Sequence, residues 1–264
     1  MSFSLSEIST VAASFADDLA AYRAAGFDGI GIWESKLGDD DADLAAFRAS
    51  GLRATNCVPL VPSILPNAVV PGPEDVEERI ASMCASTARL ARFEPDCVLC
   101  LTGPGGDGDR ATIVDGLRRV AAAAADAGVR LGLEPIHASQ RAELTTITTI
   151  PETLDLLDEA GLPDVGIMVD LWHVGDTPDV ERHLSRNIGR ITGVHVAEHV
   201  PGRADRGLPG ERCAELMRVL RNAGWQGAWD VEIFGDPERE DSLWSLPVDQ
   251  AARRAHGAVV RAAG

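Results

Sequence analysis

Short apolar runs alternate along the chain with longer stretches in which apolar residues recur every three or four positions. The short runs are typical of buried strands and the longer stretches of amphipathic helices. This alternation predicts eight strands: Phe3–Ser9, Ile30–Trp33, Arg53–Pro59, Cys97–Thr102, Arg130–Pro135, Val165–Leu171, Ile191–Val196 and Ala228–Phe234. It predicts helices over Phe15–Ala25, Asp43–Ser50, Pro73–Phe93, a stretch that ends at Ala127, Pro151–Ala160, Pro178–Arg186, Glu211–Ala223 and Pro247–Ala262.

Eight strand–helix units are the number that a closed (β/α)8 barrel, a TIM barrel, requires. Alanine-glycine pairs end several predicted helices, as at Ala25-Gly26 and Ala127-Gly128, and such pairs are typical of helix C-caps. An open, doubly wound sheet is the alternative, but no G-x-G-x-x-G motif follows the first predicted strand. We therefore predict an α/β fold, with a single TIM-barrel domain over residues 1–264.

The composition and charge of the chain indicate which partners and which compartment to expect. The chain has 264 residues and 41 acidic against 24 basic side chains, so its formal charge is −17. Nucleic-acid binders usually present a basic face, and anionic membrane surfaces attract basic segments, so we expect neither partner. The five cysteines are odd in number and irregular in spacing, which favours reduced thiols. With no predicted signal peptide or membrane span, we expect a cytoplasmic protein.

Four ionisable residues lie at or near the C-terminal ends of the last four predicted strands: Glu134, Asp170, His195 and Glu232. An ionisable group within an apolar strand is costly unless it is paired or binds a metal ion. In a barrel, the C-terminal ends of the strands form the rim that carries the active site. The spacing therefore predicts a metal site there, although each residue alone is also compatible with a satisfied buried polar group.

The predicted donor set contains three carboxylates and one imidazole. Such an oxygen-rich set favours one divalent ion, Mn²⁺ first, with Mg²⁺ or Co²⁺ as alternatives. Because side chains alternate along a strand, Asp230 faces the same way as Glu232 and is a candidate to orient another ligand.

Other candidate side chains flank this site. His137, just beyond the fifth predicted strand, is either a substrate contact or an ordinary loop residue. Trp33, at the end of the second predicted strand, is either an apolar wall for a sugar face or a packing residue. Cys97-Val-Leu-Cys100 has a zinc-like spacing, but without a second pair it is better explained as part of a buried strand.

With these motifs the chain resembles the sugar phosphate isomerase/epimerase family of xylose-isomerase-like barrels, which includes ketose 3-epimerases, hydroxypyruvate isomerase and inosose dehydratase. The resemblance spans nearly the whole chain. It is carried by Glu134-Pro135, Asp170-Leu171-Trp172-His173, His195-Val196-Ala197-Glu198, Asp230-Val231-Glu232 and the segment from Pro201-Gly202-Arg203 to Leu208-Pro209-Gly210-Glu211.

The resemblance implies roles for particular residues. Glu134, Asp170, His195 and Glu232 would bind the metal, and Glu134 and Glu232 would also form the catalytic acid/base pair. His173 would contact a substrate oxygen near the reacting carbon. Arg203, or alternatively Arg206, would contact the distal oxygens or an anionic group. Barrels of this family commonly pair, so a homodimer is also implied.

The expected function is a divalent-metal-dependent sugar isomerase or epimerase that works through an enediolate. A carboxylate would remove a proton next to the carbonyl of an aldose, ketose or related compound, and a second group would return one. The alternative uses the same site as a lyase or dehydratase on a keto-sugar, keto-inositol or 3-keto-glycoside. Endonuclease-IV-like phosphodiester cleavage requires more histidine ligands and a basic groove, and a non-catalytic barrel would not require metal ligands.

Overall fold

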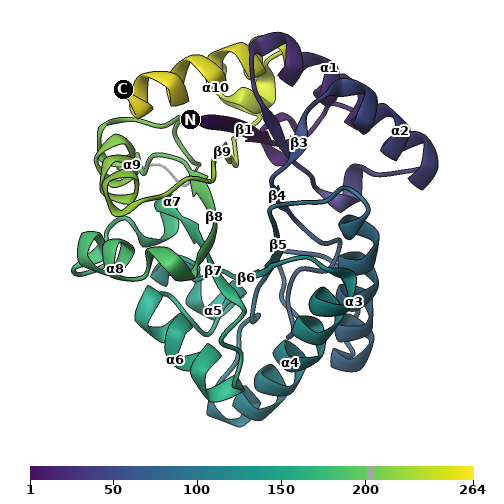
Figure 1. Ribbon diagram of the computed structural model, residues 1–264, viewed down its shortest axis with the longest axis vertical. Helices are drawn as coiled ribbons and strands as arrows, with labels where there is room; N and C mark the ends of the chain where they lie inside the picture. The colour runs from purple at the N-terminus through teal and green to yellow at the C-terminus, as the bar shows by residue number, and fades with distance from the viewer. Residues whose placement is uncertain (201–204) are drawn as a thin grey trace.

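The strands of the protein lie side by side in one parallel sheet, in the order β3-β2-β1-β9-β8-β7-β6-β5-β4. The structure is a computed structural model that describes residues 1–200 and 205–264. Figure 1 shows the sheet in the middle of the molecule and the helices around it. The strands are β1 (Ser2–Ser6), β2 (Gly29–Gly31), β3 (Arg53–Ala54), β4 (Asn56–Cys57), β5 (Cys97–Cys100), β6 (Leu131–Leu133), β7 (Gly166–Asp170), β8 (Ile191–Val196) and β9 (Ala228–Val231).

The sheet closes on itself through a strand that is split in two. β3 pairs with β2, whereas β4 pairs with β5. Thr55, between the two halves, donates its N–H to the Ile30 carbonyl at 2.9 Å and accepts the Cys97 N–H at 3.1 Å. β3 and β4 therefore act as the third of eight strands, and the predicted TIM-barrel fold is confirmed.

The helices also follow the prediction, with two additions. They are α1 (Phe15–Ala25), α2 (Asp40–Ser50), α3 (Val76–Ala91), α4 (Arg110–Ala127), α5 (Arg141–Leu144), α6 (Ile150–Ala160), α7 (Leu171–Val174), α8 (Val180–Arg186), α9 (Glu211–Ala223) and α10 (Val248–Ala263). α5 and α7 were not predicted, because four residues are too few to show a helical period. The glycines after α1 and α4 have φ of 98° and 72°, as the predicted C-caps require.

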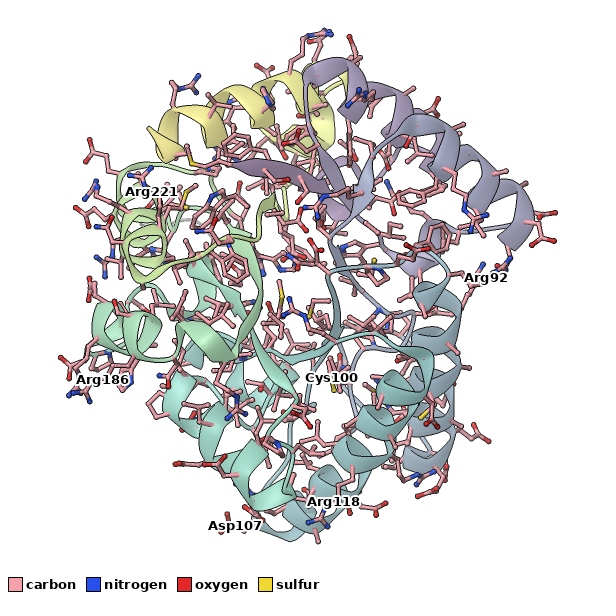
Figure 2. The ribbon with its side chains drawn as sticks, in the orientation of Figure 1. Arg92, Cys100, Asp107, Arg118, Arg186 and Arg221 are labelled. Atoms are coloured by element: carbon pink, nitrogen blue, oxygen red, sulfur yellow. The ribbon has the colours of Figure 1, made fainter. Side chains whose placement is uncertain are left out.

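The side chains of β5 point alternately into two apolar layers. Val98 and Cys100 pack outward in the main core between sheet and helices. Cys97 and Leu99 face into the barrel, where they join a smaller apolar cluster. In Figure 2, Cys100 lies inside the molecule, while Arg92 and Arg186 project from its edge. The two cysteines of the zinc-like motif are buried and free, and they face opposite sides of the strand, so the structural interpretation holds.

Within the residues that the structure describes, no helix is both long enough and apolar enough to cross a bilayer.

Candidate active site

The four predicted ligand residues converge at the C-terminal end of the barrel. Asp170 ends β7 and is the register partner of His195 in β8, while Glu134 and Glu232 follow β6 and β9. Asp170 and His195 are fully buried, and Glu134 and Glu232 are each 4% exposed. We refer to these four residues as the carboxylate–histidine cluster.

His195 lies at the centre of this cluster. Its Nδ1 atom is 3.7 Å from Glu134 Oε1 and 3.3 Å from Glu232 Oε2. Its Nε2 atom is 3.7 Å from Asp230 Oδ2, and Thr55 Oγ1 donates to that same oxygen at 3.2 Å. Asp230 therefore lies where it can fix the orientation of the imidazole, so that Nδ1 faces the glutamates.

The cluster suits a divalent cation. Among the described residues, Glu134 Oε1 and both ring nitrogens of His195 have no hydrogen-bond partner. Asp170, His195 and Glu232 each offer a ligand atom within 4.8 Å of the others. Buried polar atoms are rarely left unpaired, and carboxylates with an imidazole are ligands that Mn²⁺ and related ions accept. The residues thus fit the predicted metal ion.

Burial strongly perturbs the protonation of the cluster. It raises the pKa of Glu134 to about 7 and that of Asp230 to about 6. Burial alone would lower the pKa of His195, but the nearby carboxylates, Glu232 first, outweigh it and raise the pKa to about 10. Metal ligands must be deprotonated, so binding of a cation here would release protons.

A side chain of the protein already supplies one cation to the cluster. The Arg206 guanidinium donates from Nη1 to Asp170 Oδ2 at 2.5 Å and to Glu232 Oε2 at 2.6 Å. It is buried and lies over the rings of Phe234 and Trp172, with Cζ 4.4 Å and 5.2 Å from their centroids. Arg206 and a metal ion would therefore use the same two carboxylates.

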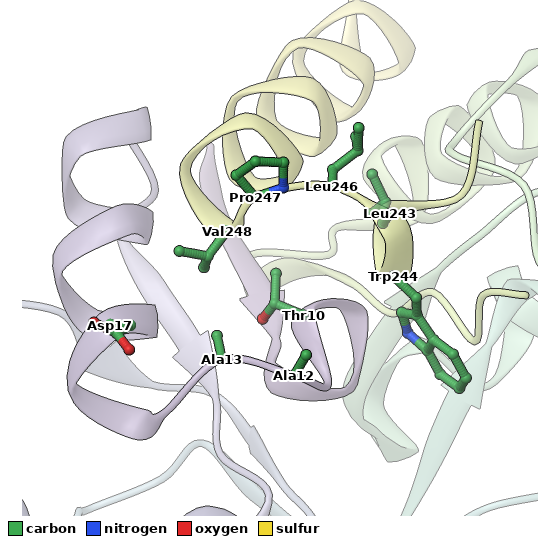
Figure 3. Close-up of a pocket in the computed structure, with 9 residues that line it drawn as sticks. All are labelled: Thr10, Ala12, Ala13, Asp17, Leu243, Trp244, Leu246, Pro247 and Val248. Carbon is green, nitrogen blue, oxygen red and sulfur yellow. The ribbon is translucent and has the colours of Figure 1, made fainter. Parts of the chain in front are cut away.

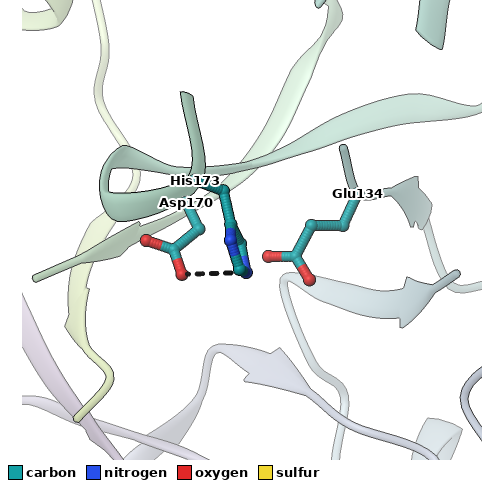
Figure 4. A group of neighbouring side chains, drawn as sticks. All are labelled: Glu134, Asp170 and His173. Carbon is teal, nitrogen blue, oxygen red and sulfur yellow. Dashed lines mark ion pairs between the residues drawn. The ribbon is translucent and has the colours of Figure 1, made fainter. Parts of the chain in front are cut away.

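His173 stands next to this arginine. Its Nδ1 accepts the backbone N–H of His137 at 3.0 Å, so a neutral ring carries its proton on Nε2. Nε2 lies 3.0 Å from Arg206 Nη2 and 3.6 Å from Asp170 Oδ2. Burial, and secondly the arginine, lower the pKa of His173 well below its usual value, so the ring is neutral. Figure 4 shows it with Glu134 and Asp170, a second group whose atoms could hold a metal.

The cluster opens into a cavity of about 360 Å³. Glu134, Glu232, His173 and Arg206 line it, and Trp33 also lines it, as the sequence analysis allowed. His137, in contrast, supports His173 from behind, with its own ring nitrogens 2.7 Å from Ser139 Oγ and 3.2 Å from Asp176 Oδ2. Arg203, the other predicted substrate contact, lies outside the described residues.

Sequence reasoning missed the groups that hold Trp33 in place. Its backbone N–H donates to Glu7 Oε2 at 2.9 Å, and its indole Nε1 donates to Ser6 Oγ at 2.9 Å. Both partners come from the end of β1 and the turn after it. The available signal was the polar pair Ser6-Glu7 near the end of the first predicted strand.

A second cavity, of about 260 Å³, lies at the beginning of α10 and of α1 (Figure 3). Its lining carries a single ionisable side chain, Asp17, which accepts a hydrogen bond from Ser14. A lone surface carboxylate does not provide the paired groups that acid/base chemistry requires. The cavity at the barrel rim, in contrast, is lined by Glu134 and Glu232 together.

Comparisons with known proteins agree with this architecture. The family described as xylose isomerase-like TIM barrel matches residues 19–255. A D-psicose 3-epimerase from Enterocloster bolteae is 34% identical over 131 residues. That alignment spans 48% of this chain and only 41% of the relative.

Two solved structures show the same fold. Protein SMc04130 from Sinorhizobium meliloti 1021 superposes with a TM-score of 0.86 at 24% identity, over 98% of each chain. The IOLI protein, solved with a bound zinc atom, superposes with a TM-score of 0.78 at 18% identity. The second superposition covers 99% of this chain and 98% of that one. At these identities the likeness concerns the fold.

Proposed function

The chain belongs to the xylose isomerase-like TIM barrel family, and from that membership we propose that it is a divalent-metal-dependent isomerase or epimerase. Its substrate is a hydroxylated carbonyl compound, and the reaction passes through an enediolate. The observation that carries the proposal is the pair Glu134 and Glu232, which line one cavity and both lie within 3.7 Å of His195 Nδ1. The epimerase relative supports the reaction class, within the part of the chain that aligns.

Glu134, Asp170, His195 and Glu232 would hold the metal ion. A divalent ion beside a carbonyl stabilises the negative charge that develops on the substrate oxygens when the neighbouring carbon loses its proton. The excess of carboxylates favours Mn²⁺, with Mg²⁺ or Co²⁺ as alternatives. The zinc atom of the IOLI structure supports metal binding in this fold.

The two glutamates are the proposed proton carriers. One removes the proton from the carbon next to the carbonyl, and the other returns a proton to the opposite face or to the neighbouring carbon. The neutral His173 and the guanidinium of Arg206 would hold substrate oxygens in the same cavity.

The test measures metal content and solvent exchange together. Protein loaded with Mn²⁺ is incubated with D-psicose and a panel of other ketoses in D₂O, and deuterium is located by NMR. We expect deuterium next to the carbonyl with the wild type and not with Glu134→Gln or Glu232→Gln. Glu143→Gln changes an exposed glutamate outside the cavity lining and is the matched control.

The carbon that carries deuterium distinguishes epimerisation from isomerisation. Deuterium with inversion at one carbon means epimerisation, and deuterium at the neighbouring carbon means isomerisation. Loss of water or of an aglycone would instead support the lyase or dehydratase alternative. Protein that retains no divalent ion after loading would contradict the metal assignment.

A further inference from the structure

The lining of the active-site cavity combines a few charged side chains with many apolar ones. Its charged residues belong to the carboxylate–histidine cluster or contact it directly. The ends of β4, β5 and β6 and the loop that follows β4 supply a largely apolar part of the lining, the apolar wall. The charged and apolar parts of the lining therefore suit different parts of one substrate.

The apolar wall is part of a buried hydrophobic cluster inside the barrel. Val58, Leu99, Leu101, Ile136 and Leu144 line the cavity, and they belong to an apolar cluster separate from the main core. Val70 and Trp33 pack against that cluster and extend it toward the cavity mouth.

One polar side chain interrupts this wall. The amide of Gln140 lines the cavity, and within the described part of the chain its Oε1 atom has no hydrogen-bond partner. The apolar wall thus provides for about one polar contact with a bound molecule.

A free ketose can react at the charged side chains but gains little binding free energy from the apolar wall. It carries a hydroxyl on nearly every carbon, and a hydroxyl buried without a partner costs about 1–3 kcal/mol. An aromatic ring or a compact alkyl group gains free energy on the same surface, because apolar area leaves water.

We propose that the substrate is an amphipathic hydroxy-carbonyl compound, in which an aryl or compact alkyl group joins the hydroxylated carbonyl part. The hydroxylated part meets Glu134, Glu232, His173 and Arg206, and the apolar group lies on the wall around Leu101. The inference rests on the proposed function for the position of the reacting carbon, and on the cavity lining for the rest.

The test uses two ligands with the same α-hydroxy ketone: acetoin, which carries a methyl group, and 1-hydroxy-1-phenylpropan-2-one, which carries a phenyl ring. Calorimetric titration of the Mn²⁺-loaded protein gives both affinities. We expect the phenyl compound to bind about tenfold tighter, or more, to the wild type. Leu101→Asn should remove the preference while acetoin binding stays within about twofold.

Since Leu101 is buried, a second variant avoids a folding defect. Val69 lines the cavity and is 53% exposed, so Val69→Ser should fold and reduce the preference by about threefold. Val260→Ser, at a 41% exposed position on α10, is the matched control and should leave the preference unchanged.

Equal affinity for the two ligands, or a preference that survives in Leu101→Asn, overturns the inference. Deuterium exchange into D-psicose without any phenyl preference would keep the proposed function and overturn the apolar subsite. A phenyl preference without deuterium exchange into any ligand would support the subsite and contradict the proposed function.

Discussion

Two groups of buried ionisable side chains lie at the same end of the barrel and differ in how they are paired. The first, the β1–β2 cluster, consists of Glu7, Thr10, Asp18, Tyr22 and Lys36. Asp18 accepts from Lys36 at 2.6 Å and from Thr10 at 2.7 Å. The second is the carboxylate–histidine cluster, in which buried ligand atoms remain unpaired among the described residues.

The contrast separates a structural network from a binding site. In the β1–β2 cluster Lys36 balances the charge of Asp18 and links α1 and the turn after β1 to the loop after β2. One oxygen of Glu7, Oε1, has no hydrogen-bond partner among the described residues. In the carboxylate–histidine cluster, the Arg206 guanidinium pairs with two of the three carboxylates, Asp170 and Glu232. Buried charge without a matching partner is tolerated where a ligand supplies it.

The largest expected effect is on metal binding. His195→Gln replaces the imidazole whose Nδ1 faces both glutamates, so we expect Mn²⁺ affinity to fall about hundredfold or more. Calorimetric titration measures it, with a thermal melt of the metal-free protein as the check on folding. Wild-type affinity in this variant would erase the distinction between the two clusters.

The reverse experiment targets the β1–β2 cluster. Lys36→Met leaves the fully buried Asp18 without its ion-pair partner and should cost about 3 kcal/mol of unfolding free energy, measured by denaturant titration. Mn²⁺ affinity should stay unchanged. Arg182→Met, which breaks an exposed pair with Asp179, is the control and should cost less than about 1 kcal/mol. A shift in metal affinity with unchanged stability would reverse the roles of the clusters.

Arg206 tests whether the guanidinium and the metal ion compete. Arg206→Gln frees oxygens of Asp170 and Glu232, so Mn²⁺ should bind about tenfold tighter, although catalysis should fall. Neutral His173 carries a proton on Nε2, and this proton faces the N–H groups of Arg206. Because two donors face each other there, this contact favours release of the arginine. Arg239→Gln, which removes a part-exposed arginine paired with Asp241, should leave the affinity as it is. Weaker Mn²⁺ binding in Arg206→Gln would mean that the arginine supports the ion.

The smallest expected effect is on how the stability of the protein depends on pH. Burial, and secondly the Asp18 carboxylate, raise the pKa of Glu7 well above its usual value, so Glu7 carries a proton that can face Asp18. A raised folded-state pKa means that the folded chain binds more protons than the unfolded one above about pH 4.5, so stability falls as pH rises through the folded value. Glu7→Gln keeps the group neutral.

Thermal melts between pH 5 and pH 8 should therefore show a shallower decline in Glu7→Gln than in the wild type. We expect the difference in slope to amount to a few degrees over this range, roughly what 1 kcal/mol produces in a chain of this size. Identical pH profiles would mean that Glu7 is charged in the folded protein.

The sequence was informative where one local rule decides the outcome. The start and end of α1, α9 and β8 were predicted correctly, because caps and apolar periods coincide there. The convergence of Glu134, Asp170, His195 and Glu232 followed from parallel strands that end at one rim.

The features that the sequence did not predict depend on tertiary contacts. The insertion of Arg206 between Asp170 and Glu232 depends on how a loop folds back, which no periodicity encodes. The position of His137 behind His173 depends on a short helical turn after β6. The apolar wall combines side chains from three strands and a proline-rich loop, none of them unusual alone.

Thr55 connects the barrel seam to the candidate site. Its backbone closes the third strand onto its neighbours, and its hydroxyl donates to Asp230 in β9, the residue beside His195. A chain still emerging from the ribosome cannot complete this contact until β9 has been made. The proposed metal site, which also requires Glu232 directly after β9, should therefore be among the last parts of the fold to form.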